Sequence, residues 1–331
     1  GLVSFIVISI LVIIYDFTRS FSMWDEFSHW GVMVKEMIRL DSFYSDINST
    51  LMVHKDYPPI YSIYELLWIK LCGTYNESYL ITSMHFFELT MFIPSMTELE
   101  FKTGKLFKCI INTIIGITII ALIIIFLDKD QIYNSIYIDY SLGIFLAYIY
   151  YSIISSKEKE DNFLLFNLML SSIFLLLTKQ IGLPLYISIL FLYFMYIKID
   201  WHNLMRLCKI ILFIIIIPIA FYISWNKYIS TISVDSQFIT SNIEVSKLPS
   251  IINGTSGTIA QKDAAKNYLN ALLHKNITSS YIKLSFIELV IIGIVLLTII
   301  LFLNKNKFSK RQSLIIILTI ILLSIGYAFV M

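Results

Sequence analysis

The chain has 331 residues, of which 57% are apolar and 15% are charged, and its formal net charge is +2. Because soluble domains carry about 25% charged residues, this composition excludes an ordinary soluble domain and indicates a polytopic membrane protein. The small net charge and the lack of a Lys/Arg-rich block exclude a nucleic-acid partner. The three cysteines form neither a CxxC pair nor a Cys/His ligand spacing, so we expect no disulfide framework and no zinc site.

The two ends of the chain do not look like natural termini. The sequence starts at Gly1 rather than at a Met, and it stops at Met331 inside an apolar run. We therefore expect a fragment in which residues 1–331 form one transmembrane domain. The bias towards Ile, Tyr, Phe, Asn and Lys is typical of an AT-rich bacterial genome.

Apolar segments of nearly membrane-spanning length recur along the chain. A span needs about 20 mostly apolar residues, because every backbone polar group must be satisfied within about 30 Å of hydrocarbon. The pattern predicts an all-α fold of about nine transmembrane helices, at residues 1–15, 79–96, 107–127, 136–154, 163–178, 181–197, 209–225, 285–303 and 313–331.

The basic residues of the short connections predict the orientation. Lys and Arg are enriched on the cytoplasmic side of membrane proteins. One alternate set of connections is basic, with Lys102, Lys105, Lys108, Lys157, Lys159, Lys198, Arg206, Lys209, Lys305, Lys307, Lys310 and Arg311. The opposite set, 16–78 and 226–284, then lies outside the cell membrane.

Both outer segments contain predicted helices. Residues 27–40 and 60–71 place apolar side chains at helical spacing between charged ones, which predicts two interfacial helices in the first outer loop. In the second outer segment, residues 259–273 predict an amphipathic helix that could act as a lid over the outer face.

The densest polar cluster follows the first span. Asp25, Glu26 and His29 put a base, a second acid and a titratable ring on one short segment at the membrane surface, which is a plausible catalytic edge. The alternative is a helix N-terminus, in which Asp25 caps the interfacial helix and Glu26 favours its positive dipole end. Spacing alone leaves both interpretations open.

A second polar group stands at the corner His54-Lys55-Asp56-Tyr57-Pro58-Pro59, where two prolines fix the backbone. The corner either contributes side chains to a site or only ends the loop, with Lys55 solvated.

These motifs together resemble a known family. The order of an apolar span, Asp-Glu-x-x-His-Trp-Gly, a helix ending Lys-Glu-Met, and Tyr-Pro-Pro resembles the first outer loop of type C (GT-C) glycosyltransferases, which include protein O-mannosyltransferases and aminoarabinose transferases of lipid A. The resemblance covers Trp24 to about Trp68 and extends weakly to Asp139 and to residues 176–185. It implies an enzyme that takes a sugar from a polyprenyl phosphate.

The resemblance also implies roles for the polar residues. Asp25 is the expected base, which takes the proton of the acceptor hydroxyl, and Glu26 holds the acceptor or a divalent ion. A cation faces the departing phosphate. Lys55 is the first candidate for that cation, and Arg19 and Arg39 are the alternatives. Some relatives carry a Lys directly before the proline, where this chain has Tyr57. The remaining expected substrate-binding residues of the two motifs are His29, His54 and Tyr57.

Two further residues complete the predicted site. Asp139, at the outer start of a span, stands where similar transferases have a second acid, and it is expected to be catalytic; otherwise it is an interfacial Asp or a helix cap. Lys179, in a tight outer turn, looks like the Thr-Lys segment of several relatives and could bind the lipid phosphate or snorkel to the interface. We predict that Asp25, Lys55, Asp139 and Lys179 converge on one outward-facing cavity.

His85 and Glu88 lie three residues apart in the second predicted span, where ionisable groups are expensive. Pairing of the two inside the bundle would satisfy both, so we expect no metal site there.

The sequence therefore predicts an inverting glycosyltransferase of the bacterial cell membrane, active on the extracytoplasmic side. Its donor is a polyprenyl-phosphate sugar and its acceptor a cell-envelope glycan, lipid or protein; a divalent cation is the only cofactor considered. The alternatives are a flippase or exporter, a polymerase or ligase of lipid-linked glycans, and a non-catalytic scaffold. We find no internal repeat, which a transporter often has, and Arg is scarce, whereas a polymerase or ligase would show several.

Overall fold

The computed structural model describes residues 2–97, 135–156, 161–199, 202–232, 250–274 except 252, 283–303 and 308–328, with five further positions between 98 and 134. The predicted span 107–127 therefore lies outside the described residues. The chain divides into two compact units, 1–234 and 235–331, which are treated separately below.

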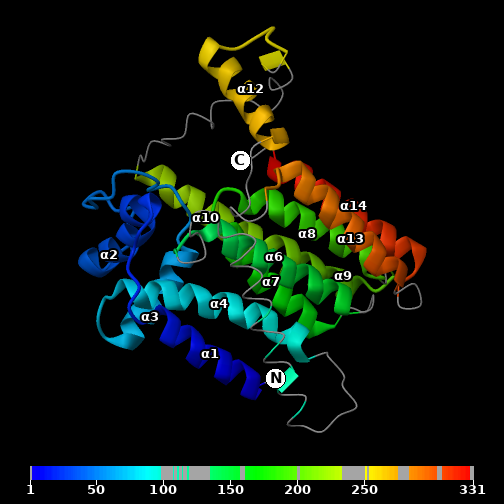
Figure 1. Ribbon diagram of the computed structural model, residues 1–331, viewed down its shortest axis with the longest axis horizontal. Coiled ribbons are helices and arrows are strands. Elements are labelled where there is room, and N and C mark those ends of the chain that lie inside the picture. The colour runs from blue at the N-terminus through cyan, green and yellow to red at the C-terminus, as the bar shows by residue number, and fades with distance from the viewer. Residues whose placement is uncertain are drawn as a thin grey trace. The chain divides into compact units, whose positions relative to one another are not determined.

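Every element of the described residues is a helix, as the predicted all-α class requires (Figure 1). The first unit contains α1 (Leu2–Asp16), a π-helical turn η1 (Glu26–Trp30), α2 (Gly31–Leu40), α3 (Ile60–Cys72), α4 (Glu77–Thr97), α6 (Ile138–Ser155), α7 (Asn162–Leu176), α8 (Gly182–Tyr196) and the continuous run α9 (Leu204–Ile210), η3 (Ile211–Ile216) and α10 (Ile217–Thr231). The second unit contains α12 (Ile259–His274), α13 (Phe286–Leu303) and α14 (Lys310–Ala328).

The helices coincide with the predicted segments wherever the structure describes them. Each predicted span other than 107–127 overlaps one helix or the continuous run α9–η3–α10, and the two predicted interfacial helices correspond to η1 with α2 and to α3. The predicted amphipathic helix at 259–273 is α12, which packs against α13 within the second unit.

Within the described part of the chain, three helices are long and apolar enough to cross a membrane: Ile138–Ser155, Leu204–Thr231 and Phe286–Leu303. In α13 only 6% of the residues are buried within the chain. So much exposed apolar surface on one helix needs a cover of lipid or protein. The three long apolar helices agree with a membrane protein. The apolar helices α1, α7 and α8 have fewer than 18 residues and do not meet the same length criterion.

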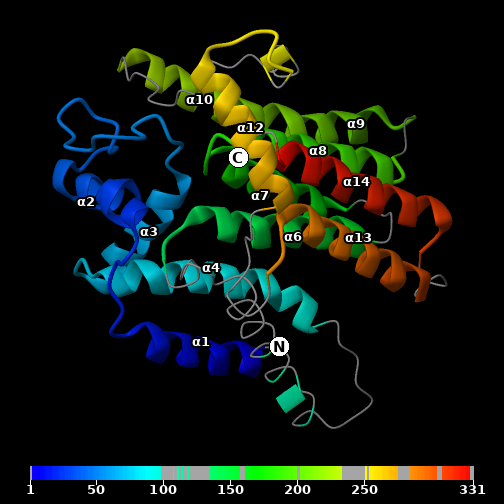
Figure 2. The same ribbon diagram turned by 45° about the horizontal axis from the view of Figure 1, so that its top comes forward.

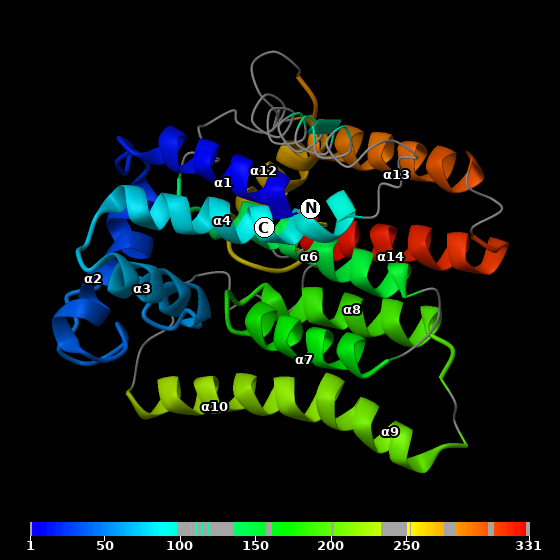
Figure 3. The same ribbon diagram turned by 90° about the horizontal axis from the view of Figure 1, so that it is seen from below.

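The longest helical run, Leu204–Thr231, has an irregularity with a local cause. Pro218 has no backbone N–H to give and would clash with the carbonyl of residue 214 in a regular α-helix. The π-helical turn Ile211–Ile216 lies directly before it and widens the helix there. At 1.5 Å per residue the run is about 42 Å long, and it packs along α7 (Figure 3).

Among the described residues of the first unit, apolar side chains pack the helices together at two places. Ile8 and Val12 of α1 pack against Leu89 of α4. Further along, Phe87 of α4 stacks on Phe174 of α7 with ring centroids 4.9 Å apart, and other aromatic rings of α3 and α6 surround this pair. The second region brings α3, α4, α6 and α7 to one place, which fixes the helix ends near which the polar residues gather.

The segment from 17 to 72 lies at one end of α4 and α6 in all three views of the first unit (Figures 1, 2 and 3). The Phe21 amide donates to Glu77 Oε2 at 2.9 Å, and Lys35 approaches the same carboxylate at 3.8 Å. At the other side of the segment, the amide of Ile60 donates to the Leu177 carbonyl at 3.0 Å. The segment is therefore fastened to α4 and to the turn between α7 and α8.

That turn depends on a residue without a side chain. A Cβ at Gly182 would overlap the carbonyl of Leu175, whereas a Cβ at Gly143, in α6, would have no neighbour within 4 Å. A backbone carbonyl cannot move aside as a flexible side chain can, so only glycine allows α8 to begin this close to the end of α7.

We predict that Gly182→Ala lowers the free energy of unfolding by about 1–3 kcal/mol, because overpacking against backbone forces the two helices apart. Thermal unfolding of the purified protein in detergent measures this. Gly143→Ala is the matched control and should be neutral or slightly stabilising, since alanine favours helix. Equal melting temperatures for the two variants would contradict the close approach at Gly182.

Candidate functional site

Glu26 is the anchor of the site. Its side chain is fully buried, and its two oxygens accept backbone N–H bonds from Ser22 and Met23 at 2.7 Å and from Ile136 at 3.1 Å. Backbone donors of this kind stabilise a buried carboxylate. Glu26 thus ties the start of the outer segment to the residues that lead into α6.

Asp25 stands in the N-cap position of η1 but does not cap it, because its side chain accepts no hydrogen bond from the turn. The cap interpretation of Asp25 is therefore wrong. The half-buried side chain instead interacts with the hydroxyl of Tyr137, which precedes α6. Burial, followed by the negative charge of Asp25, raises the pKa of Tyr137 to about 12, so that the phenol stays protonated and can donate to the carboxylate.

Asp139 and Lys179 form an ion pair. Lys179 Nζ lies 2.8 Å from both carboxylate oxygens, and the two side chains are 24% and 35% exposed for Lys179 and Asp139 respectively. Asp139 lies in the first turn of α6, whose N-cap position is Tyr137, so Asp139 is not that cap either. Lys179 is held in the turn between α7 and α8, where the Gly182 amide donates to its carbonyl at 2.8 Å.

Four rings of the outer segment pack against one another near these acids. The imidazole of His54 stacks on Tyr57 with ring centroids 4.4 Å apart, and His29 meets His54 edge-on at 4.5 Å. Trp30 closes the group, 4.7 Å from His29 and 5.4 Å from Tyr57. His54 has a backbone φ of 58°, in the left-handed region that a non-glycine residue rarely adopts, so the fold holds this ring in place against a local conformational cost.

Burial and nearby charge set the protonation of these rings. Burial is the main cause that lowers the pKa of His29 to about 3, and the positive charges of His54 and Lys179 add to it. Burial also lowers the pKa of His54, although Asp56 and Asp25 oppose this effect. Burial raises the pKa of Tyr57, followed by the charges of Asp56, Asp139 and Asp25. Near neutral pH the site therefore contains neutral imidazoles and protonated phenols.

Hydrogen bonds from three other residues hold the corner that carries His54 and Tyr57. The buried hydroxyl of Tyr44 donates to the Tyr57 carbonyl at 2.6 Å. Gln180 donates to Asp56 Oδ2 at 2.7 Å, and the Trp225 indole donates to the Asp56 carbonyl at 3.2 Å. The corner thus contacts both the turn before α8 and the middle of α10.

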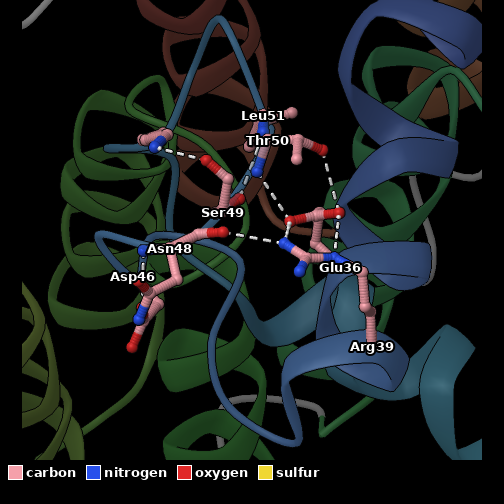
Figure 4. A network of polar contacts seen from close by, with 8 residues as sticks. Glu36, Arg39, Asp46, Asn48, Ser49, Thr50 and Leu51 are labelled. Carbon is pink, nitrogen blue, oxygen red and sulfur yellow. Dashed lines mark hydrogen bonds and ion pairs between the residues drawn. The ribbon is translucent and has the colours of Figure 1, made fainter.

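A second network, shown in Figure 4, fastens the loop 41–59 to α2. Glu36 accepts two bonds from Arg39, at 3.0 and 2.6 Å, and two from Thr50, at 2.7 Å from the amide and 3.0 Å from the hydroxyl. Arg39 also donates to the Asn48 carbonyl at 2.8 Å. The bonds from Arg39 and Thr50 lower the pKa of Glu36 to about 2, against the effect of burial.

The three cations that the sequence analysis proposes as phosphate ligands are each bound by other groups. Arg39 is bound by Glu36, and Lys55 donates to the Ser49 carbonyl at 3.0 Å. Arg19 lies 3.8 Å from Asp16 and over the ring of Tyr15. Among the contacts of the described residues none links Arg19, Arg39 or Lys55 to the two acids, whereas Lys179 binds Asp139 directly.

The predicted site residues therefore fall into two groups. Contacts and electrostatic interactions bring together Asp25, His29, His54, Tyr57, Asp139 and Lys179. Glu26 is buried and binds backbone amides instead. The other predicted cations, Arg19, Arg39 and Lys55, are bound by groups outside this set. Sequence reasoning missed Tyr137, whose position two residues before Asp139 at the start of a span is the only signal that could have found it.

The buried His85 has a different partner from the one predicted. Its Nδ1 lies 2.8 Å from Asp16 Oδ2, while Glu88 accepts a bond of 2.6 Å from the Ser141 hydroxyl. Each ionisable group is thus satisfied across helices, from α1 to α4 and from α6 to α4. No group of three or more His, Cys, Asp or Glu that could hold a metal occurs within the described part of the chain.

No protein-family model, curated protein or solved structure matches this chain. The site is therefore interpreted from its own geometry.

We predict that Glu36→Gln loosens the loop 41–59. The substitution removes charge-assisted bonds worth about 1.5–3 kcal/mol each, so the amide of Thr50 should exchange with deuterium at least about tenfold faster. Asp46→Asn, in the same loop, keeps the oxygen that accepts from Asn48 and is the matched control. Unchanged exchange at Thr50 would contradict the network.

The same network predicts a pH dependence. The folded-state pKa of Glu36 is about 2 and the ordinary value is 4.5, so the folded protein binds fewer protons than the unfolded chain between these values. The contribution of Glu36 to stability is present above pH 4.5 and is lost as the pH falls through about 2. Comparison of wild type and Glu36→Gln by thermal unfolding from pH 5 downward should show the difference between them shrink.

We also predict that the ring of His29 does not titrate between pH 5 and pH 8, since its pKa is lowered to about 3. Nitrogen chemical shifts of protein labelled at histidine measure this, and His29→Gln identifies the signal. A midpoint near the ordinary value of 6.5 would mean that the ring is solvated rather than buried against His54 and Trp30.

Proposed function

We propose that this protein is a membrane glycosyltransferase of the GT-C type, which moves a sugar from a polyprenyl phosphate to a hydroxyl of a cell-envelope acceptor. In this proposal the chain has about nine transmembrane helices, and the site lies on the extracytoplasmic face of the cell membrane. The resemblance of the first outer loop to GT-C enzymes supports the proposal, and so does the geometry of the acids.

The observation that carries the proposal is the state of Asp25. It stands where it could cap a helix, yet its side chain makes no capping bond and lies in one electrostatic group with His54, Tyr57 and Tyr137. A buried structural acid would be saturated, as Glu26 is. A half-buried carboxylate that acts on the same rings as Asp139 and Lys179 is instead suited to take a proton from a bound ligand.

The reaction then follows as a single displacement. The acceptor oxygen attacks the anomeric carbon, the bond from that carbon to the phosphate oxygen breaks, and the hydroxyl proton passes to Asp25. Both oxygens of Asp139 are bound by Lys179, so Asp139 has less room to act as the base. One displacement inverts the configuration at the sugar carbon, because retention would need a second covalent step.

Lys179 is the proposed phosphate ligand. An ammonium group has three N–H donors, and two point at Asp139. The third is available for a phosphate oxygen, and Asp139 holds the ammonium in place while it binds. His29, His54 and Tyr57 supply neutral hydrogen-bonding groups around the sugar, and Glu26 acts as a positioning residue for Asp25. A divalent cation would add positive charge beside the phosphate.

The decisive experiment is release of polyprenyl phosphate from a set of polyprenyl-phosphate sugars by the purified protein with a mixture of envelope acceptors. Asp25→Asn should lower the rate of release by about 10²–10⁴-fold, the usual contribution of a general base. Asp41→Asn is the matched control, because Asp41 is exposed in a left-handed turn, with φ 48°, that asparagine also adopts readily.

Glu26→Gln separates positioning from chemistry. It weakens the charge-assisted bonds to three backbone amides, so it should lower the melting temperature of the substrate-free protein, which Asp25→Asn should leave unchanged. Release that continues at the wild-type rate in Asp25→Asn would overturn the role of Asp25. Binding of labelled donor without release from any sugar would instead favour a flippase or exporter.

A further inference from the structure

One buried acid in the first unit takes no part in the proposed reaction. Glu65, on the face of α3 that packs against its neighbours, is only 1% exposed. Neither of its carboxylate oxygens has a hydrogen-bond partner among the described residues. An ionised carboxylate buried without partners is strongly unfavourable, and such a group keeps its proton instead.

Among the described residues, no cation is a cause of the pKa shift of Glu65. On its own helix the nearest titratable groups are Tyr61 and Tyr64, and the loop before α4 adds Tyr75; the electrostatic effect of Glu65 raises the pKa of all three phenols. The π-helical turn adds Glu26, a second acid. The hydroxyls of Tyr61 and Tyr75 are also buried without a partner in the described part of the chain.

The charged groups of the packed helices are engaged elsewhere. On α2, Lys35 approaches Glu77 and Arg39 is bound by Glu36. On α4, His85 is bound by Asp16 and Glu88 by Ser141. Nothing among these contacts compensates a negative charge on Glu65.

We propose that Glu65 is a proton-binding site, a carboxylic acid that holds its proton inside the folded protein at neutral pH. Burial, with the charge of Glu26 as a second cause, raises the pKa of Glu65 well above its ordinary range. The proton leaves when water or a polar ligand group reaches the carboxyl, so its release is linked to any opening of α3. This inference does not depend on the sugar-transfer reaction.

A proton suits this site better than a metal ion. A sodium or divalent ion needs several oxygen ligands arranged around it, and the described residues contain no such acidic group. A proton needs only the carboxyl itself, and the tyrosines around it tolerate a neutral acid.

Infrared spectroscopy of the purified protein in lipid nanodiscs tests the proposal directly. A protonated carboxylic acid has a carbonyl-stretch band that a carboxylate lacks. At pH 7.5 the wild type should show such a band, Glu65→Gln should lack it, and it should fade as the pH is raised. Glu88→Gln removes another buried acid of the first unit and should leave the band in place.

The proposal is overturned if wild type and Glu65→Gln give the same spectrum, since Glu65 would then be ionised. It is also overturned if sodium chloride, but not choline chloride at equal ionic strength, removes the band, because the site would then bind sodium. Sugar transfer is measured separately, so its failure would leave this result intact.

Stability provides a second readout. A folded protein that keeps a proton which the unfolded chain releases becomes less stable as the pH rises above the ordinary carboxyl value of 4.5. The melting temperature of Glu65→Gln should therefore exceed that of the wild type by a margin that grows from pH 4.5 to pH 8. A margin that is independent of pH would contradict the bound proton.

Discussion

The buried carboxylate of Glu26 is the contact on which the rest of the site depends. A charged group can be buried only where hydrogen-bond donors replace its water, and here the donors are the amides of Ser22, Met23 and Ile136. Two of them belong to the chain just before η1 and the third lies 110 residues further on. One side chain thus determines both the bend of the outer segment and its attachment beside α6.

This constraint explains why two adjacent acids differ in environment. Because Glu26 points inward to meet the amide of Ile136, its neighbour Asp25 is directed away and lies half-buried near Tyr137. The sequence contains no sign of the difference, since both residues are adjacent acids in the segment that follows the first span. Only the contact with a residue distant in sequence distinguishes the anchor from the side chain that is available for chemistry.

The helices themselves could be predicted from local information. Long apolar runs have few alternatives to a helix, so α6, α13 and the run α9–η3–α10 follow from composition and length. The interfacial helix α3 likewise follows from the spacing of its apolar residues after two prolines.

Polar partners were less predictable, because they depend on which helices meet. His85 lies three residues from Glu88 on α4, and a pair between them satisfies every rule of helix spacing. The imidazole is nevertheless bound by Asp16, because α1 packs against α4 and brings that carboxylate within 2.8 Å. In the same way, Lys55 is close in sequence to the proposed site but donates to Ser49, whereas Lys179 reaches Asp139 from another turn.

The charges of the site carry a consequence for the proposed donor. Asp139 is paired with the ammonium group of Lys179, and among the described residues no ion pair includes Asp25, so a phosphate that enters adds negative charge to a site with more carboxylates than cations. His54 is placed to offset that excess, because Asp25 and Asp56 already raise its pKa against the effect of burial. A phosphate beside it would act in the same direction. In the proposed enzyme a bound phosphate therefore opposes the lowering of the His54 pKa by burial and by Lys179, and a divalent cation that arrives with the phosphate would weaken this effect.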